Sequence, residues 1–443
     1  MKNEIIAGLD LGTSKVTCMI AKISPVLYEN GTNPGPEIIG VGISESKGLS
    51  NGIVINLERA TESIKTAIST AEKNAGVKLT ELYTAITGAH IRGESSRGVT
   101  SISRSDKEIT PADVSHVIDQ AQAIKVPMDR SIIHSIPQEF ILDDQPGIHD
   151  PIGMNANRLE GNIYIITGAT TAVQNITKSV NRAGFKVRDI VLQPIASSYA
   201  VLDPDEQELG CVLIDMGGGT TDVAVFYNGG IHDILSLPLG GADITNDISI
   251  GLSTPRRIAE QIKLKHGVAR SDLAHELPPR PRTTNTNPEL IKIQKLGHNS
   301  EQVIEKKLLA SIIAPRIEEI FALLRQKLTN NGRLPTNDRG LFYYDFLPSG
   351  IILTGGTAKM PGITGLAERV FGIPAKIGVP NTIDVNQYKD PSFATSVGLI
   401  IYGSLNNQLP TMNRRSQTIS MGKFSKTPLL ATVSNRVRKW LLE

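Results

Sequence analysis

Two short stretches of the sequence combine a carboxylate with glycines and hydroxyl side chains, the residue types that bind phosphate and a divalent cation. Residues 10–15 read DLGTSK, and residues 215–222 read DMGGGTTD. A tight glycine turn lets backbone N–H groups approach an anion, and serine and threonine hydroxyls add donors. Carboxylate oxygens suit a hydrated Mg²⁺ that also binds substrate phosphates. Either stretch could instead be an ordinary hairpin turn, and the second, with three consecutive glycines, is the stronger signal.

Both stretches lie in the same kind of local element. Residues 5–23 (IIAGLDLGTSKVTCMIAKI) and residues 211–227 (CVLIDMGGGTTDVAVFY) each contain an apolar strand that ends in aspartate, a polar glycine turn and a second strand. About half the chain separates the two hairpins. An internal repeat of this kind predicts two related subdomains that face one another.

A third glycine turn, TGGTAKMPG at residues 354–362, ends another predicted strand and could pack against a purine face. The sequence lacks the P-loop pattern GxxxxGK[ST] and the dinucleotide pattern GxGxxG, which excludes those two nucleotide folds. It also lacks HExxH and clusters of cysteine and histidine, so hydrolysis by zinc is not indicated.

The composition is that of an ordinary globular protein. The chain has 443 residues, of which 40% are hydrophobic and 20% are charged, and this length allows two or three domains. The formal net charge of +2 does not indicate a nucleic-acid partner. We expect neither a signal peptide nor a bilayer-spanning segment, because no apolar run reaches about 18 residues. Cys18 and Cys211, in apolar strands, are expected to be reduced core thiols.

Helical and strand-like patterns alternate along the chain, which predicts the α/β class. Helices are expected at residues 56–75, 110–124, 172–184, 238–253 and 254–267, and strands at residues 81–104, 132–142 and 162–167. Thr110 is a good N-cap, and Pro111 follows it at the first helical position. Residues 271–300 are polar and proline-rich and are predicted to form a mobile surface insertion. Residues 301–328 are predicted to form the longest helix, which would bend near Pro315.

The C-terminal residues predict a peripheral membrane anchor. Residues 404–427 are polar and basic, and no acidic residue lies between Asp390 and Glu443. A helix over residues 428–443, with Thr427 as N-cap, would be about 24 Å long, too short to span a bilayer. An apolar stripe flanked by two arginines would lie on an anionic lipid surface. The stripe is formed by Leu430, Val433, Val437, Trp440 and Leu441, and the arginines are Arg436 and Arg438. The alternative is a helix that docks on the body of the protein or on a partner.

Taken in order, the motifs resemble those of the actin, Hsp70 and sugar-kinase ATPase superfamily. Residues 10–15 match its phosphate-1 motif, residues 215–222 its phosphate-2 motif, and residues 354–363 its adenosine motif. QPIASSYAVL (193–202) and PSFATSVGLIIYG (391–403) match its two connecting helices. The resemblance implies an α/β, two-lobed actin-like ATPase fold of duplicated RNase H-like subdomains, with ATP in the cleft between the lobes.

The same resemblance assigns roles to individual residues. Asp10 and Asp215 would hold Mg²⁺ through its water shell, and Gln193 would lie near the attacking water, so these three are the candidate catalytic residues. Glu260 and Lys263 match ribose and adenine contacts, although an ordinary exposed helix pair would give the same pattern. The phosphates would be cradled by Gly12, Thr13, Ser14, Lys15, Gly217, Gly218, Gly219, Thr220 and Thr221. The adenosine motif adds Gly355, Gly356, Thr357 and Met360.

The segment between the two glycine loops resembles one family in particular. Residues 86–104 and 109–161 resemble subdomain 1C of the FtsA family of bacterial cell division proteins, and residues 312–328 (IIAPRIEEIFALLRQKL) resemble its subdomain 2B helix. The resemblance runs from about residue 4 to residue 404. It implies an ATP-binding adaptor, with at most slow hydrolysis, that tethers FtsZ filaments to the cytoplasmic face of the inner membrane at the division site. Help in assembling the Z ring, recruitment of later division proteins and self-association into actin-like filaments are also implied.

The resemblance further implies a division into subdomains. In the first lobe, subdomain 1A would comprise residues 1–84, 166–203 and 384–403, and subdomain 1C residues 85–165. In the second lobe, subdomain 2A would comprise residues 204–240 and 336–383, and subdomain 2B residues 241–335. A flexible linker at residues 404–427 would lead to the anchor helix at residues 428–443. The FtsZ C-terminal tail would bind in 2B, where Arg316 matches the family helix. Lys307 and Arg325 are further candidates, although both would also be explained as solvated charges on a helix.

Three other classes of protein are alternatives to this one. A scaffold of a type IV pilus system, similar to PilM, shares the subdomain plan and is the main alternative. A small-molecule kinase would need a carboxylate base aimed at a substrate hydroxyl, and the sequence does not point to one. A chaperone would need a peptide-binding domain after Gly403, for which too few residues follow.

Overall fold

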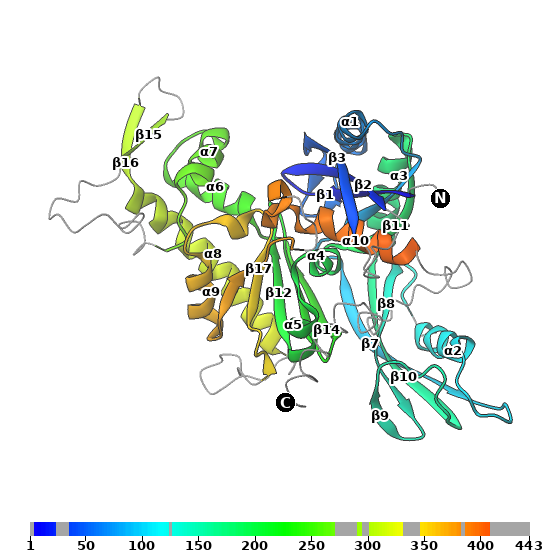
Figure 1. Ribbon diagram of the computed structural model, residues 1–443. Coiled ribbons are helices and arrows are strands. Elements are labelled where there is room, and N and C mark those ends of the chain that lie inside the picture. Colours follow the sequence, from blue (N-terminus) through cyan, green and yellow to red (C-terminus); the bar gives the residue numbers. More distant parts are fainter. Residues whose placement is uncertain are drawn as a thin grey trace, which may run out of the picture.

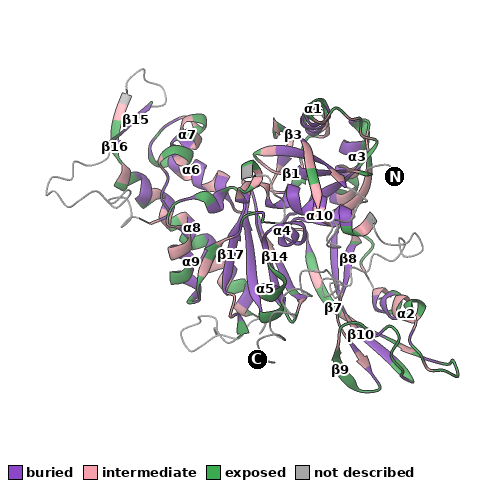
Figure 2. Cartoon of the chain, viewed as in Figure 1, coloured by how far each residue is buried: buried purple, intermediate pink, exposed green. Residues whose placement is uncertain are grey.

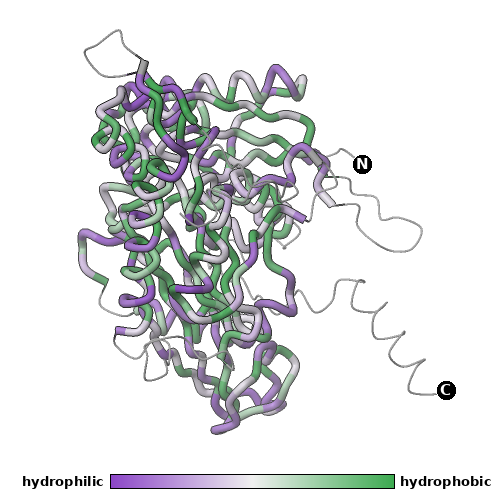
Figure 3. Tube along the Cα trace, turned by 90° about the vertical axis from the view of Figure 1, so that its left-hand side faces the viewer, coloured by the Kyte–Doolittle hydropathy of each residue, from purple (hydrophilic) through white to green (hydrophobic). Residues whose placement is uncertain are grey.

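The computed structural model has two lobes, each built around a five-stranded sheet (Figure 1). The structure describes residues 4–23, 35–123, 126–270, 290–294, 301–330, 346–381 and 386–407. Buried residues follow the sheets and the helix faces that cover them (Figure 2). Hydrophobic and hydrophilic stretches alternate along the chain (Figure 3). Among the described residues, no helix combines the length and the apolar character needed to cross a membrane.

Lobe 1 is organised by a mixed sheet with the strand order β3-β2-β1-β6-β11. Its strands are β1 (Glu4–Leu11), β2 (Lys15–Ile23), β3 (Pro36–Glu45), β6 (Glu81–Ile86) and β11 (Lys186–Leu192). The first three strands pair antiparallel, whereas β6 runs parallel to β1 and β11 runs parallel to β6. Helices α1 (Leu57–Ala75) and α3 (Thr170–Arg182) pack together on one side of the sheet, and α4 (Gln193–Val201) and α10 (Ala394–Asn407) pack together on the other.

Lobe 2 repeats this sheet with the order β14-β13-β12-β17-β18. The strands are β12 (Cys211–Met216), β13 (Thr221–Tyr227), β14 (Gly230–Leu237), β17 (Ile351–Thr354) and β18 (Ala375–Ile377). Their directions follow the pattern of lobe 1, antiparallel across the first three strands and parallel across the others. The duplication predicted from the two glycine hairpins is therefore confirmed. Helix α5 (Pro204–Leu209) packs against β13, and helix α9 (Ile363–Phe371) packs against β17 and β18.

The two lobes share part of their apolar core. Successive side chains of a strand point to opposite faces of its sheet. In β12, Val212 and Ile214 belong to the core of lobe 2, whereas Cys211 and Leu213 join the core cluster of lobe 1. Both predicted core cysteines, Cys18 and Cys211, are buried and free. The shared core therefore joins the two lobes along β12.

A separate four-stranded sheet is inserted in lobe 1 between β6 and α3. Its order is β7-β10-β8-β9, formed by β7 (Arg92–Ser101), β8 (Arg130–Leu142), β9 (Gln145–Ile148) and β10 (Arg158–Ala169). Helix α2 (Pro111–Gln122) packs on it, and the whole unit projects from lobe 1 at the lower right of Figure 1. Gly98 permits this packing, because a Cβ at that position would lie 1.9 Å from the carbonyl oxygen of Val117.

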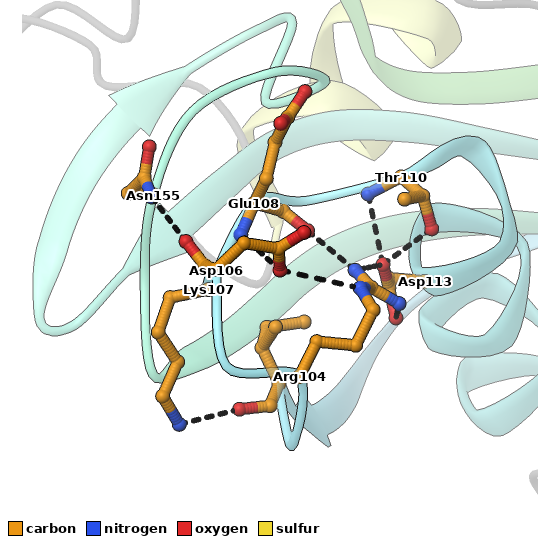
Figure 4. A network of polar contacts seen from close by, with 8 residues as sticks. Arg104, Asp106, Lys107, Glu108, Thr110, Asp113 and Asn155 are labelled. Carbon is orange, nitrogen blue, oxygen red and sulfur yellow. Dashed lines mark hydrogen bonds and ion pairs between the residues drawn. The ribbon is translucent and has the colours of Figure 1, made fainter.

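The start of α2 is fixed by a polar network around Asp113 (Figure 4). Its Oδ2 accepts hydrogen bonds from the backbone N–H of Thr110 at 2.8 Å and from Thr110 Oγ1 at 2.6 Å. Arg104 pairs with the same carboxylate at 2.6 Å, and this contact lowers the pKa of Asp113 to about 2. The predicted helix start, with Thr110 as N-cap and Pro111 at the first position, is confirmed.

The unit inserted in lobe 2 after β14 contains α6 (Gly241–Gly251), α7 (Arg256–His266), a hairpin and the long helix α8 (Lys306–Thr329), which includes Pro315. The prediction that this helix begins at residue 301 is wrong. Residues 301–305 form strand β16 (Glu301–Glu305), which pairs with β15 (Leu290–Gln294). Buried isoleucines alternate with more exposed neighbours in both strands, as in a half-buried hairpin. The remainder of the predicted 271–300 insertion, residues 271–289 and 295–300, lies outside the described residues.

The last described helix also differs from its prediction. The linker was predicted to begin at residue 404, but α10 continues through Asn407. Gly403 lies so close to the lobe 1 sheet that a Cβ there would be 2.7 Å from Tyr83 Cε2 and 2.8 Å from Ile6 Cγ2. This glycine therefore allows close packing and does not terminate the helix. Residues 408–443, with most of the predicted linker and the whole predicted anchor, lie outside the described residues.

Candidate functional site

The first glycine loop connects β1 to β2 and follows Asp10, which is 7% exposed. Burial raises the pKa of Asp10 to about 6, although the positive charge of Lys15 acts in the opposite direction. Asp10 Oδ1 has no hydrogen-bond partner among the described residues. Buried polar atoms are normally hydrogen-bonded, so this oxygen is suited to bind a water molecule or a hydrated cation.

Lys15, at the end of the same loop, is held by the segment that precedes α10. Its Nζ donates a hydrogen bond to Ser392 Oγ at 3.2 Å and lies 4.4 Å from the centroid of the Phe393 ring. Burial lowers the pKa of Lys15, while the charge of Asp10 raises it. The ammonium group is thus oriented beside the carboxylate by residues from the other end of the chain.

The second glycine loop connects β12 to β13 and follows Asp215, which is more deeply buried than Asp10. Asp215 Oδ2 accepts hydrogen bonds from Ser197 Oγ at 2.6 Å and from Thr395 Oγ1 at 3.3 Å. Burial raises the pKa of Asp215 to about 7; the Ser197 hydrogen bond lowers it, and the charge of Asp10 adds to the increase. The two aspartates are therefore close enough to repel one another.

The two glycine loops lie directly against each other. A Cβ at Gly218 would lie 2.3 Å from Ser14 Oγ, and a Cβ at Gly219 would lie 2.5 Å from Thr13 Oγ1. Any side chain at these glycines would separate the loops, so the fourth and fifth positions of each motif meet only because lobe 2 contributes no Cβ there. The structure brings together both predicted phosphate loops, including Gly12, Thr220 and Thr221 within them.

The third glycine turn joins the second loop from the side of lobe 2. Thr357, in the short helix η4 (Thr357–Lys359), donates a hydrogen bond from Oγ1 to the carbonyl oxygen of Gly217 at 3.0 Å. The same oxygen accepts from the backbone N–H of Gly241 at 3.0 Å. Gly355 has a φ of 87°, and a Cβ there would lie 2.4 Å from Asp215 Oδ1. Gly356 and Met360 flank this turn, Gly356 exposed and Met360 buried.

The predicted ribose and adenine residues lie beside the start of α6. Lys263 Nζ donates to the carbonyl oxygen of Gly241 at 2.7 Å and pairs with Glu260 Oε2 at 2.8 Å. Gln193, the first residue of α4, is buried and follows β11 directly. The backbone N–H of Leu192, one residue earlier, donates to His134 Nε2 at 2.9 Å, so the inserted sheet helps to hold the start of α4.

The residues predicted to bind the FtsZ tail lie elsewhere, along α8. Arg316 Nε contacts Asp247 Oδ2 at 2.5 Å, and Arg316 Nη1 contacts Glu319 Oε2 at 2.7 Å. Arg325 Nη1 donates to the carbonyl oxygen of Val370 at 2.7 Å, and Lys307 is exposed. The predicted membrane-contact residues, Leu430, Val433, Arg436, Val437, Arg438, Trp440 and Leu441, lie outside the described residues.

Several residues that take part in this site received no individual role from the sequence, although Asp222 lies within the predicted 215–222 motif. Asp222 is buried; its Oδ1 accepts from Thr87 Oγ1 at 2.5 Å and its Oδ2 from Thr220 Oγ1 at 2.9 Å, and burial raises its pKa. Thr87 follows β6 of lobe 1, so this contact also joins the lobes. Ser197 and Thr395 lie within the two segments recognised as connecting helices, but no local pattern singles out their hydroxyls.

Two sheets of one topology, with facing carboxylate and glycine loops at their junction, define an actin-like nucleotide-binding fold. Solved structures agree on the fold. A PilM–PilN type IV pilus biogenesis complex matches with a TM-score of 0.59 and 15% identity over 90% of this chain and 98% of that chain. MreB5 of Spiroplasma citri bound to ADP matches with a TM-score of 0.52 and 15% identity over 91% and 98%. At this identity, the likeness concerns the fold alone.

Sequence comparisons identify the family. The family model "Cell division protein FtsA" matches residues 212–398, and the model "SHS2 domain inserted in FTSA" matches residues 88–167. The cell division protein FtsA of Pseudomonas aeruginosa is 36% identical over 99% of this chain and 97% of its own length, and that of Escherichia coli is 32% identical over 99% and 97%. The chain belongs to the FtsA family of cell division proteins. The predicted family and fold class are confirmed, and the resemblance to the pilus scaffold is one of fold.

Proposed function

We propose that the chain binds ATP with Mg²⁺ between its lobes and, in that state, links FtsZ filaments to the membrane at the division site. The observation that carries the nucleotide part is the pair of buried aspartates on facing glycine loops, one of which keeps an oxygen without a hydrogen-bond partner among the described residues. A hydrated Mg²⁺ fits this pair, because it binds few carboxylates and keeps most of its waters. When bound, the ion neutralises charge on the phosphates.

The proposed nucleotide contacts follow from the placement of the loops. Asp10 and Asp215 would hold the metal through water, and the N–H and hydroxyl groups of the two loops, together with Lys15, would hold the phosphates. Glu260 and Lys263 would contact the ribose and the base, beside the turn formed by Gly355, Gly356, Thr357 and Met360. Because burial raises the pKa of both aspartates, binding of a cation would be accompanied by release of protons near neutral pH.

The same residues favour slow hydrolysis at most. Gln193 would orient the attacking water, but an amide side chain has no basic group to take its proton. The two aspartates would be occupied by the metal. ATP would then serve mainly to fix the relative position of the lobes.

The proposed partners are the FtsZ C-terminal tail, later division proteins, anionic lipids and further copies of the chain, and not nucleic acid. The FtsZ tail would bind along α8 near Lys307, Arg316 and Arg325. Arg316 already has two carboxylate partners, so a carboxylate of the tail would have to share or displace them. The subdomain boundaries implied by the family resemblance are part of this proposal. The protein would lie on the cytoplasmic face of the inner membrane as a peripheral protein, attached through residues 428–443.

A lipid co-sedimentation experiment tests this function. The full chain and a chain that ends at Lys426 are mixed with anionic vesicles, with and without FtsZ, and ATP binding is measured for both. We expect the shorter chain to lose pelleting with lipid and to keep its affinity for ATP. With the full chain, FtsZ should pellet with the vesicles.

Two point variants refine the experiment. Trp440→Glu places a charge in the predicted apolar stripe and should behave like the shorter chain. Asn435→Glu adds the same charge on the opposite side of the predicted helix, at about 100° per residue, and should still pellet. Equal pelleting of the two variants would rule out the predicted stripe as the membrane contact.

A further inference from the structure

A short hairpin reaches the nucleotide loops from lobe 1. It is formed by β4 (Leu49–Ser50) and β5 (Ile53–Val54), which follow β3 in the chain. Its two turn residues, Asn51 and Gly52, have φ values of 47° and 77°. An Asn-Gly turn with both residues in the left-handed region is a favoured two-residue hairpin connection. The tip is therefore well defined by its own sequence.

The hairpin tip lies between the two lobes. A Cβ at Gly52 would lie 2.5 Å from the carbonyl oxygen of Thr87, so the tip is seated on the residue that follows β6. A Cβ at Gly219, in the lobe 2 loop, would lie 2.8 Å from Asn51 Oδ1 and 2.5 Å from Thr13 Oγ1. The amide of Asn51 thus crosses from lobe 1 to the third glycine of the opposite loop.

The residue that the hairpin tip contacts is itself bonded to lobe 2. Gly52 packs closely against the carbonyl oxygen of Thr87. The hydroxyl of Thr87 donates a hydrogen bond to the buried carboxylate of Asp222 at 2.5 Å. Asp222 stands three residues after Gly219 in the same lobe 2 loop and hairpin. The tip and the loop that it faces are therefore tied to each other through a buried hydrogen bond.

The first and the third glycine of the lobe 2 loop have different neighbours, which indicates in which direction a bound nucleotide would extend along the loop. Its first glycine, Gly217, is contacted by Thr357 and Gly241, on the side where Lys263 also lies. Its third glycine, Gly219, is the one that faces Asn51. A nucleotide with its base near Thr357 and Lys263 would extend its phosphates from Gly217 toward Gly219. The last phosphate of the chain would then be the one closest to Asn51.

We propose that the side-chain amide of Asn51 donates a hydrogen bond to the terminal phosphate of ATP, and that this contact makes the site prefer ATP over ADP. The inference rests on the proposed binding of ATP between the lobes. An asparagine carries both a carbonyl oxygen and an NH₂ group, and a rotation of the amide exchanges their places. Gly219 leaves the amide room to do so, since it has no side chain.

Two substitutions at this position keep the turn and remove the NH₂ group of the side-chain amide. Asn51→Gly removes the side chain at a φ that glycine adopts freely, and Asn51→Asp replaces the NH₂ with a negatively charged oxygen in the same shape. Asn56→Asp is the matched control. Asn56 is exposed, caps α1 through a hydrogen bond from the N–H of Arg59, and aspartate caps a helix equally well.

The affinities of the full-length protein for fluorescently labelled ATP and ADP are measured with Mg²⁺, and thermal melting reports folding. A hydrogen bond to a charged group predicts about tenfold weaker ATP binding for Asn51→Gly. A larger loss is expected for Asn51→Asp, which repels the phosphate. ADP binding should change less than about twofold in both variants, and Asn56→Asp should match the wild type for both nucleotides.

Two results would overturn the inference while leaving the proposed function standing. Wild-type ATP affinity in both Asn51 variants would show that the amide makes no phosphate contact. An equal loss of ATP and ADP affinity would show that the hairpin only supports the loop. A wild-type protein that binds neither nucleotide would overturn the proposed function and the inference together.

Discussion

The two lobes have sheets of one topology and differ in the segments that connect the corresponding strands. After the third strand, lobe 1 has only the β4–β5 hairpin before α1, whereas lobe 2 has α6, α7, β15 and β16 before α8. After the fourth strand, lobe 1 carries the inserted sheet, whereas lobe 2 carries the short turn η4. In lobe 2, the connections α6, α7 and η4 therefore contribute the residues of the proposed base site. In lobe 1, the connections reach the proposed phosphate end and form a projecting unit. The two lobes therefore share the topology of their sheets and differ in the segments that connect the strands.

The corresponding aspartates differ in the same way. Asp215 belongs to lobe 2, but Ser197 and Thr395, which donate to it, lie on α4 and α10, which pack together on the lobe 1 sheet. Asp10 has no such hydroxyl partner on its Oδ1 among the described residues. The hydrogen bonds of Asp215 therefore also join the two lobes. Asp10 is better placed to bind a hydrated cation, because its Oδ1 has no hydrogen-bond partner among the described residues.

The largest expected effect comes from removing the charge of Asp10. Asp10→Asn keeps the shape of the side chain and should weaken Mg²⁺-dependent ATP binding about 10–100-fold, the range for a lost hydrogen bond between charged partners. With EDTA in place of Mg²⁺, the same variant should bind ATP at least as well as the wild type, because a carboxylate that repels the phosphates is gone. The measurement is a nucleotide titration in both buffers. An equal loss in both would show that Asp10 supports the loop and not a metal.

The next largest effect concerns how the stability of the folded protein depends on pH when neither Mg²⁺ nor nucleotide is present. The pKa of Asp10 is about 6 in the folded protein and about 4 in an unfolded chain, so the folded state holds this proton more tightly. The contribution of Asp10 to stability is therefore fully present below about pH 4 and is lost as the pH rises through 6, by up to about 3 kcal/mol.

Asp10→Asn does not titrate, so its Tm relative to the wild type should be higher at pH 7.5 than at pH 4.5, by about 2 °C. Thermal melting in EDTA at the two pH values checks this. A difference in Tm that does not depend on pH would mean that Asp10 is already stabilised in its charged form. Adding Mg²⁺ should reduce the pH dependence, since a bound cation favours the charged form of the carboxylate.

Local sequence patterns were sufficient for the loops and the repeated sheet, because each strand–turn–strand unit is contiguous in the chain. They were insufficient where partners come from distant segments. Ser197 and Thr395, which bind Asp215, lie 18 and 180 residues from it in the sequence. The same holds for Gly403, the last residue of the segment matched to a connecting helix, whose close packing against the sheet no local pattern indicates.

The Asn51-Gly52 dipeptide is a strong hairpin signal, but nothing near it in the sequence indicates that its tip faces the other lobe. The same applies to residues 301–305, whose strand is recognisable only with its partner, residues 290–294. Family resemblance supplied the fold and the order of the motifs. It could not supply the hydrogen bonds that make one aspartate different from the other.

The smallest expected effect concerns the inserted sheet, which also contacts lobe 2. The hydroxyl of Tyr164, on β10, donates to Asp233 Oδ1 at 2.9 Å and accepts from the N–H of Ile234 at 3.1 Å. Nearby, Gln138 Nε2 donates to the carbonyl oxygen of Ile231 at 2.9 Å. The unit projecting from lobe 1 therefore rests on β14, the edge strand of lobe 2.

Tyr164→Phe removes only the hydroxyl and should destabilise the protein by about 1–2 kcal/mol, a few degrees in Tm at most, because a buried carboxylate loses a donor. Tyr227→Phe, at the exposed end of β13, is the matched control and should leave the Tm unchanged. Thermal melting of both variants at one pH is sufficient. Equal Tm values would mean that the sheet is held on lobe 2 by Gln138 and packing alone. A selective loss would show that the insertion of one lobe is anchored on the other, a contact for which lobe 2 offers no counterpart in the part of the chain that the structure describes.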